Sequence, residues 1–195
     1  HPGDHTMDSI VRLACTFGAA ITLLGVGSAT AVAQDATTAT TTVILVRHAE
    51  KASAPAADPP LTSAGEERAK ALLEAVRGAG VTAIITTQYE RTRATAAPAA
   101  GALSITPEVV TAAGRTHAQD VAAAIRKHAG QTVLVVGHSN TVPDIIRALG
   151  ADVPPICDDE YDNLYVVELP PTGAARVIMA KYGARSAVGA CTSMK

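Results

Sequence analysis

The chain has 195 residues, and its 16 Lys and Arg against 18 Asp and Glu give a formal net charge of −2. This balance lacks the basic field that nucleic-acid binding needs, and 3% aromatic residues with no Trp argue against a base-stacking platform. Hydrophobic residues at 48% and charged residues at 17% predict a folded chain rather than a disordered one.

The N-terminal region has the pattern of an export signal. Arg12 is followed by an apolar stretch over residues 13–26, and Ala31-Val32-Ala33 fits the rule for signal-peptide cleavage. The apolar stretch is short for a membrane span of ~20 residues, which favours a cleaved signal over an uncleaved anchor. The sequence predicts an exported protein, periplasmic or extracellular, whose mature chain begins at Gln34 and which meets the membrane only through its export signal.

The sequence divides into three parts. Residues 1–33 are predicted to be an N-terminal extension and signal peptide, and the origin of residues 1–6, ahead of Met7, stays open. Residues 34–42, rich in Thr and Ala without an apolar period, indicate a tether. Residues 43–195 are predicted to form a single domain, long enough to bury a core.

The domain opens with a predicted strand over residues 43–46, whose unbroken apolar character is typical of a strand covered on both faces. A Pro-rich loop follows, and a helix begins near Thr62, where Ser63 and Glu66 have the spacing of a capping box. Residues 81–86 repeat the pattern of a buried strand.

The rest of the chain continues this alternation. A helix is predicted over residues 92–102, and Pro98 is expected to kink or shorten it. In chain order there follow an irregular segment at 101–117, a helix at 120–129, a buried strand at 132–136, a helix at 141–149, and paired strands at 164–169 and 176–180.

This order predicts an α/β fold: a three-layer sandwich in which a mainly parallel central sheet carries helices on both faces. Such sheets bind ligands beyond the carboxyl ends of their strands. Arg47 and His48 follow the first strand, Arg91 comes soon after the second, and His138 follows the third. Arginine forks match phosphate oxygens, and helix N-termini add N–H donors, so this edge is expected to bind a dianionic tetrahedral group.

Four segments resemble motifs of the histidine phosphatase superfamily, and they occur in the family's order. They are Val46-Arg47-His48-Ala49-Glu50-Lys51 for the Arg-His motif, Pro60-Leu61-Thr62-Ser63-Ala64-Gly65 for the P-L-T-x-x-G segment, Thr87 to Ala96 for the S-x-x-x-R-[AT]-x-x-T-A segment, and Val136-Gly137-His138-Ser139 for the V-G-H-[SG] segment. The resemblance covers residues 43–150.

The resemblance implies a phosphoglycerate mutase-like fold and the short exported bacterial branch of the family. It implies that His48 is the phosphorylated nucleophile and that Arg47, Arg91 and His138 complete the phosphate pocket. It implies no metal and no organic cofactor. A two-histidine metal site is a weaker alternative, because the adjacent arginines would repel a cation.

One feature departs from the family pattern. Many members carry a Glu or Asp that protonates the leaving oxygen, but here Ser139 follows His138, and Glu108 and Asp120 are only weak candidates for this acid. A phosphoramidate or a good leaving group needs such an acid less, so phosphohistidine hydrolysis stays open and efficient mutase activity is disfavoured.

The predicted function is a metal-independent phosphatase that hydrolyses phosphomonoesters, with phosphohistidine left open, through an intermediate on His48. The alternatives are a non-catalytic phosphate-binding protein of the same fold and a phosphoryl transferase or mutase. The expected partner is a phosphorylated small molecule or phosphoprotein. The sequence does not reveal the substrate itself or the oligomeric state.

Several residues are predicted to be structural or are left undecided. A Cys157–Cys191 disulfide is one of two open states for these thiols. Asp58 is predicted to be a turn residue, residues 157–160 are expected to form a solvated acidic loop, and His117 and His128 are assigned no role.

Overall fold

The computed structural model describes residues 39–186 of the chain. The predicted signal peptide over residues 1–33 and Cys191 lie outside the described residues. The helices are α1 (Ser63–Val76), α2 (Glu90–Leu103), α3 (His117–Arg126) and α4 (Thr141–Ala148). The strands are β1 (Thr41–Arg47), β2 (Val81–Thr86), β3 (Glu108–Val109), β4 (Thr132–Gly137), β5 (Asn163–Leu169) and β6 (Arg176–Lys181).

The strands form one mixed sheet in the order β3-β2-β4-β1-β5-β6. Strands β3, β2, β4 and β1 run parallel, because the helices between them return the chain to the same end of the sheet. The antiparallel hairpin of β5 and β6 extends the sheet beside β1. The prediction of a mainly parallel sheet with a terminal strand pair is confirmed.

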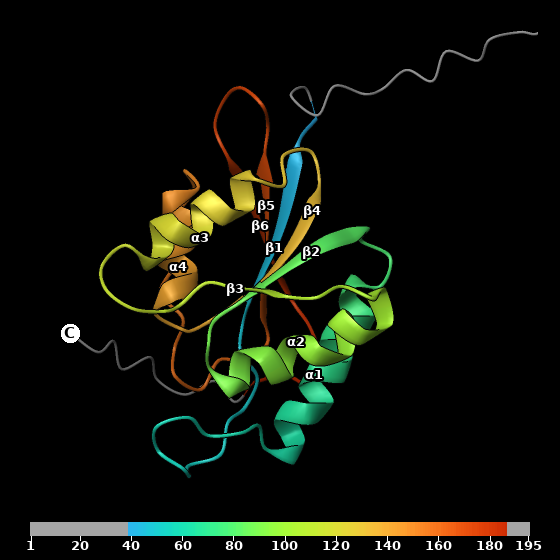
Figure 1. Cartoon of the computed structure of the whole chain (residues 1–195), viewed down its shortest axis with the longest axis vertical. Helices are drawn as coiled ribbons and strands as arrows, with labels where there is room; N and C mark the ends of the chain where they lie inside the picture. The colour runs from blue at the N-terminus through green and yellow to red at the C-terminus, as the bar shows by residue number, and fades with distance from the viewer. Residues whose placement is uncertain (1–38, 187–195) are drawn as a thin grey trace, which may run out of the picture. The chain divides into compact units, whose positions relative to one another are not determined.

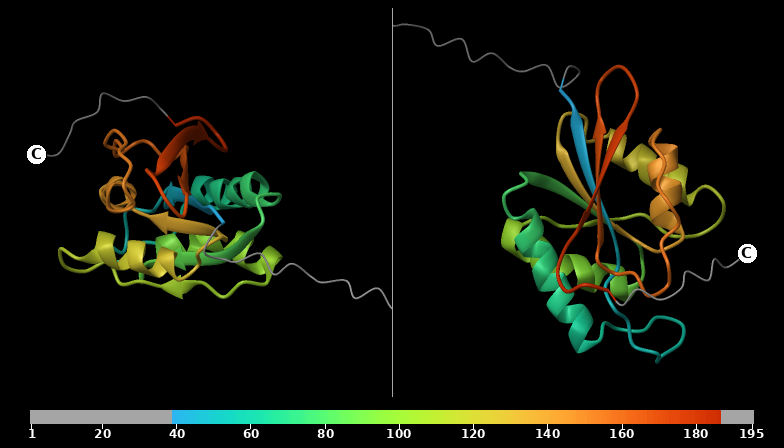
Figure 2. Two further views of the ribbon diagram at one scale, coloured as in Figure 1. Left: turned by 90° about the horizontal axis from the view of Figure 1, so that it is seen from above. Right: turned by 180° about the vertical axis from the view of Figure 1, so that it is seen from behind.

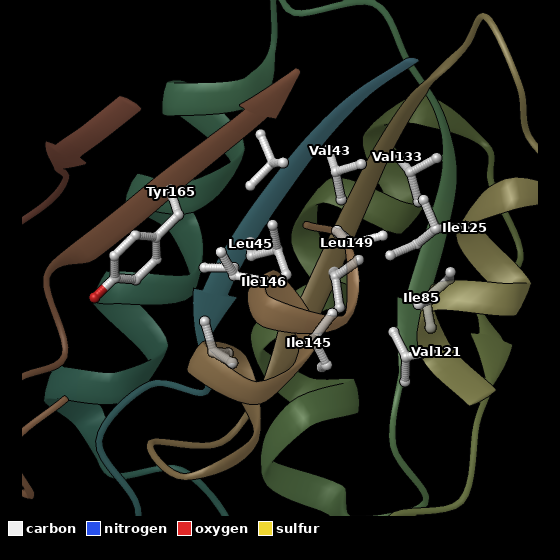
Figure 3. Packing of buried hydrophobic residues seen from close by; sticks show 14 of the residues in the cluster. Val43, Leu45, Ile85, Val121, Ile125, Val133, Ile145, Ile146, Leu149 and Tyr165 are labelled. Atoms are coloured by element: carbon white, nitrogen blue, oxygen red, sulfur yellow. The ribbon is translucent and has the colours of Figure 1, made fainter. Parts of the chain in front are cut away.

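The helices cover the sheet in two pairs. Figure 1 shows α3 and α4 together on one side of the strands and α1 and α2 on the other, and the right-hand view of Figure 2 agrees. The side chains of β1 alternate between these layers, as the two-residue period of a strand requires. Val43 and Leu45 join the core against α3 and α4, which Figure 3 shows, whereas Ile44 and Val46 join the core against α1 and α2. The predicted three-layer sandwich is therefore confirmed.

Two elements differ from the prediction. Strand β1 begins at Thr41, because Thr41 and Thr42 pair with Leu169 and Glu168 of β5, so the tether predicted over residues 34–42 overlaps the strand. Pro98 lies inside α2 without ending it, and the helix continues to Leu103. An internal proline costs a helix about 3 kcal/mol. The burial of Ala96 and Ala99 against the sheet, which local sequence does not reveal, offsets this cost.

The segment at 101–117, predicted to be irregular, contains the two-residue strand β3 at the sheet edge. Helix α3 begins at His117, three residues earlier than the apolar pattern indicates. None of the helices formed by residues 39–186 combines the length and apolar character that a bilayer crossing needs.

Candidate active site

The three predicted strand ends meet at one edge of the sheet. Arg47 at the end of β1 is in register with Gly137 at the end of β4, and the His48 N–H donates a 2.8 Å hydrogen bond to the Gly137 carbonyl. A cavity of about 390 Å³ opens here, and all four predicted site residues line it. The lining residues are Arg47, His48, Lys51, Tyr89, Arg91, Ala112, Gly114, His117, His138, Ser139, Asn140, Thr141 and Asp158.

The imidazole of His48 is held in one tautomer. Its Nδ1 lies 2.8 Å from the carbonyl oxygen of Ala49, and the ring is 3% exposed. A carbonyl oxygen can only accept a hydrogen bond, so Nδ1 carries the proton and Nε2 keeps its lone pair. A neutral imidazole with its Nε2 lone pair available is the form that attacks an electrophile.

The cavity also keeps both imidazoles neutral. Desolvation by burial is the main cause that lowers the pKa of His48 to about 3; the charges of Arg47 and Arg91 act in the same direction, and the Ala49 hydrogen bond opposes them. Burial, with Arg91 as the next cause, lowers the pKa of His138 to about 4. His48 is therefore neutral over the whole physiological range.

His138 lies against His48, and hydroxyl groups of the Thr87 to Ala96 motif hold it in place. The two rings meet edge-on with their centroids 5.3 Å apart. The Oγ1 of Thr87 lies 3.2 Å from His138 Nε2 and 2.9 Å from Thr92 Oγ1. Thr87 occupies the position where the family motif has Ser. Both side chains carry a hydroxyl group, so Thr87 can make the contact with His138 Nε2 that a Ser would make.

Arg47 is held by a loop distant in sequence. Its Nη1 donates to the main-chain carbonyls of Cys157, Asp158 and Glu160 at 2.9, 2.8 and 3.0 Å, and its guanidinium lies 4.0 Å from the ring centroid of Tyr161. The acidic loop predicted to be only solvated therefore positions a site residue. Desolvation by burial lowers the pKa of Arg47.

Arg91 is stacked in the same manner on the other side of the cavity. Its guanidinium lies 4.1 Å from the ring centroid of Tyr89, and its Nη1 lies 3.6 Å from Asp58 Oδ1. Asp58 lies in a bend and also accepts a hydrogen bond from the Glu90 N–H at 2.9 Å, so it binds the first residue of α2.

The Nε atoms of Arg47 and Arg91 are buried and have no hydrogen-bond partner among residues 39–186. Unsatisfied buried donors are rare because each costs free energy, so two of them on residues that line one cavity make this cavity a candidate anion site. Tetrahedral oxyanions carry acceptor oxygens in the geometry that guanidinium forks match.

Thr95 joins the Arg-His motif to the Thr87 to Ala96 motif. Its Oγ1 accepts a 2.9 Å hydrogen bond from the Ala49 N–H and donates at 2.7 Å to the Arg91 carbonyl. One side chain thereby fixes the residue after His48 relative to the helix that carries Arg91.

The P-L-T-x-x-G segment supports the site without touching it. Thr62 caps α1 by accepting from the Gly65 N–H at 3.2 Å, and Gly65 lies so close to Glu50 that a Cβ would collide with the Glu50 carbonyl oxygen. Glu50 is not in the cavity lining, since Arg68 binds both its carboxylate oxygens at 2.9 Å, whereas Lys51 does line the cavity.

Neither weak candidate for the general acid lines the cavity. Glu108 lies 3.4 Å from Lys127 Nζ, and Asp120 accepts a hydrogen bond from Thr116 at 3.0 Å. Glu108 lies on β3 and Asp120 on α3, and both occupy positions that face away from the cavity. Asp158 is exposed and is the cavity's only lining carboxylate among the described residues.

Sequence reasoning assigned no role to two residues of the cavity, Tyr89 and His117, or to Tyr161, which lies outside the lining. Tyr89 stacks on Arg91 and lies beside His138, with ring centroids 5.4 Å apart, and Tyr161 stacks on Arg47. His117, assigned no role from the sequence, lines the cavity at the start of α3. The signal available for Tyr89 was its place beside Arg91 in the motif; the other two lie far from any motif.

Two further features bear on the sequence predictions. Cys157 is disulfide-bonded, and its predicted partner Cys191 lies outside the described residues. Within residues 39–186, no group of three or more His, Cys, Asp or Glu side chains is placed to hold a metal ion.

Comparison with known proteins agrees with this geometry. Residues 43–113 match the family model of the histidine phosphatase superfamily (branch 1). No curated protein matches the chain significantly. A candidate phosphohistidine phosphatase SixA from Nakamurella multipartitia is 25% identical, with a TM-score of 0.55, covering 74% of this chain and 98% of its own.

Two other solved structures share the fold. The protein histidine phosphatase SixA complexed with tungstate is 19% identical with a TM-score of 0.59, covering 72% of this chain and 96% of its own. Phosphoserine phosphatase from Entamoeba histolytica, in complex with 3-phosphoglyceric acid, is 14% identical with a TM-score of 0.52, covering 74% and 97%. The chain therefore has a phosphoglycerate mutase-like fold, and its residues 43–113 match the histidine phosphatase superfamily.

Proposed function

We propose that this protein is a metal-independent phosphatase that hydrolyses phosphomonoesters, and also the phosphoramidate phosphohistidine, through a phosphohistidine intermediate on His48. The observation that carries the proposal is the fixed tautomer of His48, which leaves the Nε2 lone pair available on a residue that lines one cavity with two arginines. A protein that only bound phosphate would gain nothing from a neutral, oriented imidazole beside its guanidinium groups.

The reaction follows from this arrangement. Arg47 and Arg91, with the N-terminus of α4 in the cavity wall, bind the phosphoryl oxygens and stabilise the charge that spreads over them in the transition state. His48 Nε2 attacks phosphorus, the bond to the leaving group breaks, and water then displaces phosphate from the histidine. His138 lies against His48 in the wall of the same cavity.

The test uses p-nitrophenyl phosphate with the full chain. We expect turnover that resists a chelator, vanishes in His48→Ala and persists in His128→Ala, a matched control at a histidine outside the cavity. The intermediate is expected as an acid-labile, alkali-stable phosphoenzyme in rapidly quenched reactions. Activity in His48→Ala would overturn the mechanism, and oxyanion binding without turnover of any phosphate ester would favour the binding-protein alternative.

Phosphohistidine is included in the substrate class for a chemical reason. Its leaving nitrogen departs with little need for a carboxylic acid, and a similar fold occurs in the candidate phosphohistidine phosphatase SixA. Release of phosphate from a phosphohistidine peptide with kcat/KM above that for a phosphoserine peptide would support this choice, and the reverse order would contradict it.

We also propose that the protein acts outside the cytoplasm, on the strength of the cleavage pattern at Ala31-Val32-Ala33. Mass spectrometry of the exported protein should find Gln34 at its N-terminus. Retention of the full chain inside the cells would contradict this proposal.

A further inference from the structure

The leaving group of an alkyl phosphate needs a proton, and His117 is a histidine of the cavity wall that the reaction described above does not use. It is 5% exposed, at the first residue of α3, and it lines the same cavity as His48, Arg91 and His138. Its Nε2 is buried and has no hydrogen-bond partner among residues 39–186.

The hydrogen bond at the other nitrogen fixes the tautomer of His117. Its Nδ1 lies 3.2 Å from the carbonyl oxygen of Thr111, which can only accept, so Nδ1 carries a proton. Nε2 is then a base in the neutral ring and a donor in the imidazolium. A titratable nitrogen that is buried without a partner inside a cavity is expected where a ligand supplies the missing contact.

We propose that His117 is the general acid and base of the reaction. This inference rests on the proposed phosphatase function and deepens it, because it assigns the proton transfer that neither Glu108 nor Asp120 is placed to make.

The proton and electron balance is complete within the cavity. As His48 Nε2 forms the N–P bond, the P–O bond breaks, and the leaving oxygen keeps the electron pair and takes the proton from His117 Nε2. Water then attacks phosphorus, the N–P bond breaks with its electrons returning to His48, and the proton of the water passes to His117 Nε2. The enzyme is regenerated with no other reactant.

The alternative role for His117 is to bind a phosphoryl oxygen without transferring a proton. The two roles differ in how the effect of a His117 substitution on the rate depends on the leaving group. A general acid matters most for a poor leaving group, whereas a binding residue affects every substrate equally. Because kcat/KM reports the steps up to cleavage of the P–O bond, it is the quantity to compare.

The experiment measures kcat/KM of the full-length protein for p-nitrophenyl phosphate and for glycerol 2-phosphate. In His117→Gln, we expect a loss of about 100-fold or more for glycerol 2-phosphate, the range of general acid catalysis, and a loss of less than about 5-fold for p-nitrophenyl phosphate. Gln can still donate a hydrogen bond but cannot transfer a proton. His128→Gln, the same change two residues beyond the end of α3, is expected to keep both values.

The outcomes are distinguishable. Equal losses on both substrates, or a retained rate on glycerol 2-phosphate, would overturn the role of His117. If Asp158→Asn instead shows the selective loss, the carboxylate at the cavity rim is the acid. Retained turnover of p-nitrophenyl phosphate in His117→Gln itself shows that the variant is folded. If the wild-type protein hydrolyses neither ester, the phosphatase function and this inference are both rejected. If the wild-type protein is active and His117→Gln loses activity equally on both esters, the inference alone is rejected.

Discussion

At the scale of single residues, the site depends on charges held in a buried place by contacts from distant parts of the chain. Arg47 and Arg91 each stack on a tyrosine, and each leaves a buried Nε for a ligand. His48 and His138 are neutral because burial and the arginines disfavour the imidazolium form. The arginines that would bind an anion are therefore also one of the causes that keep His48 and His138 neutral.

The planar fork of Arg91 is expected to matter more than its charge. In Arg91→Lys, kcat/KM for p-nitrophenyl phosphate should fall about 100-fold, because an ammonium group retains the charge but loses the bidentate contact and the stacking on Tyr89. Arg93→Lys, two residues further along the same helix at an exposed position, is the control. Equal activity in the two variants would show that Arg91 does not contact the transferring group.

The two buried histidines are expected to make stability depend on pH. Their folded pKa values of about 3 and about 4 lie below the usual 6.5, so the unfolded chain binds more protons than the native one below pH 6.5. The free energy of unfolding contributed by these groups is fully present above pH 6.5 and is lost as pH falls toward 4.

Urea unfolding at intervals between pH 6.5 and 4.5 measures this dependence. Each such histidine adds up to about 1.4 kcal/mol per pH unit to the slope. His48→Ala should therefore give a slope shallower than that of the wild-type protein by up to about this amount. Parallel curves for the two proteins would mean that His48 is not buried as a neutral group.

At the scale of elements, motif residues outside the cavity fix the segments that carry the cavity residues. Thr95 ties Ala49 to α2, and Thr62 and Gly65 bring the start of α1 against Glu50. Arg68 of α1 then binds the Glu50 carboxylate, with 4% of the Arg68 side chain exposed. The loop after β1 is thus held from two helices.

Gly65→Ala should destabilise the protein by about 3 kcal/mol, the upper range for overpacking, because the added Cβ would collide with a main-chain oxygen that side-chain rotation cannot move. Gly78→Ala is the matched control, since no atom lies within 4 Å of its added Cβ. Chemical denaturation measures both, and equal midpoints would contradict the close approach of α1 to Glu50.

At the scale of the whole molecule, the sheet order brings together strands that are far apart in sequence. Strand β1 lies between β4 and β5, and β2 lies on the other side of β4, so the ends of β1, β2 and β4 meet at one edge. The loop before β5 then reaches Arg47 from 110 residues along the chain. An anion at this edge contacts groups from most of the domain.

Binding of an oxyanion should therefore stabilise the whole fold. Tungstate, a tetrahedral dianion, is expected to raise the melting temperature in proportion to the logarithm of its concentration above Kd, because it binds the native state alone. Arg47→Ala should abolish the shift. A rise of the same size in that variant would place the anion elsewhere on the molecule.

The strand and helix order, the three-layer fold and the meeting of Arg47, His48, Arg91 and His138 could all be predicted from the sequence. These features follow from the local periodicity of apolar residues and from motifs of a few residues, and both can be recognised in short stretches of sequence. Pro98 shows the limit of that reasoning, since the burial of neighbouring alanines decides whether a helix tolerates a proline.

The sequence by itself determined which residue types stand at the strand ends, because side chains adjacent in the chain stay adjacent in space. Only the tertiary structure decided what those residues contact. The carbonyls that bind Arg47, the Arg68 that binds Glu50, and the burial of His117 in the cavity wall all join segments that the chain's path in three dimensions brings together. Such contacts depend on packing across the sheet edge, which no local pattern encodes.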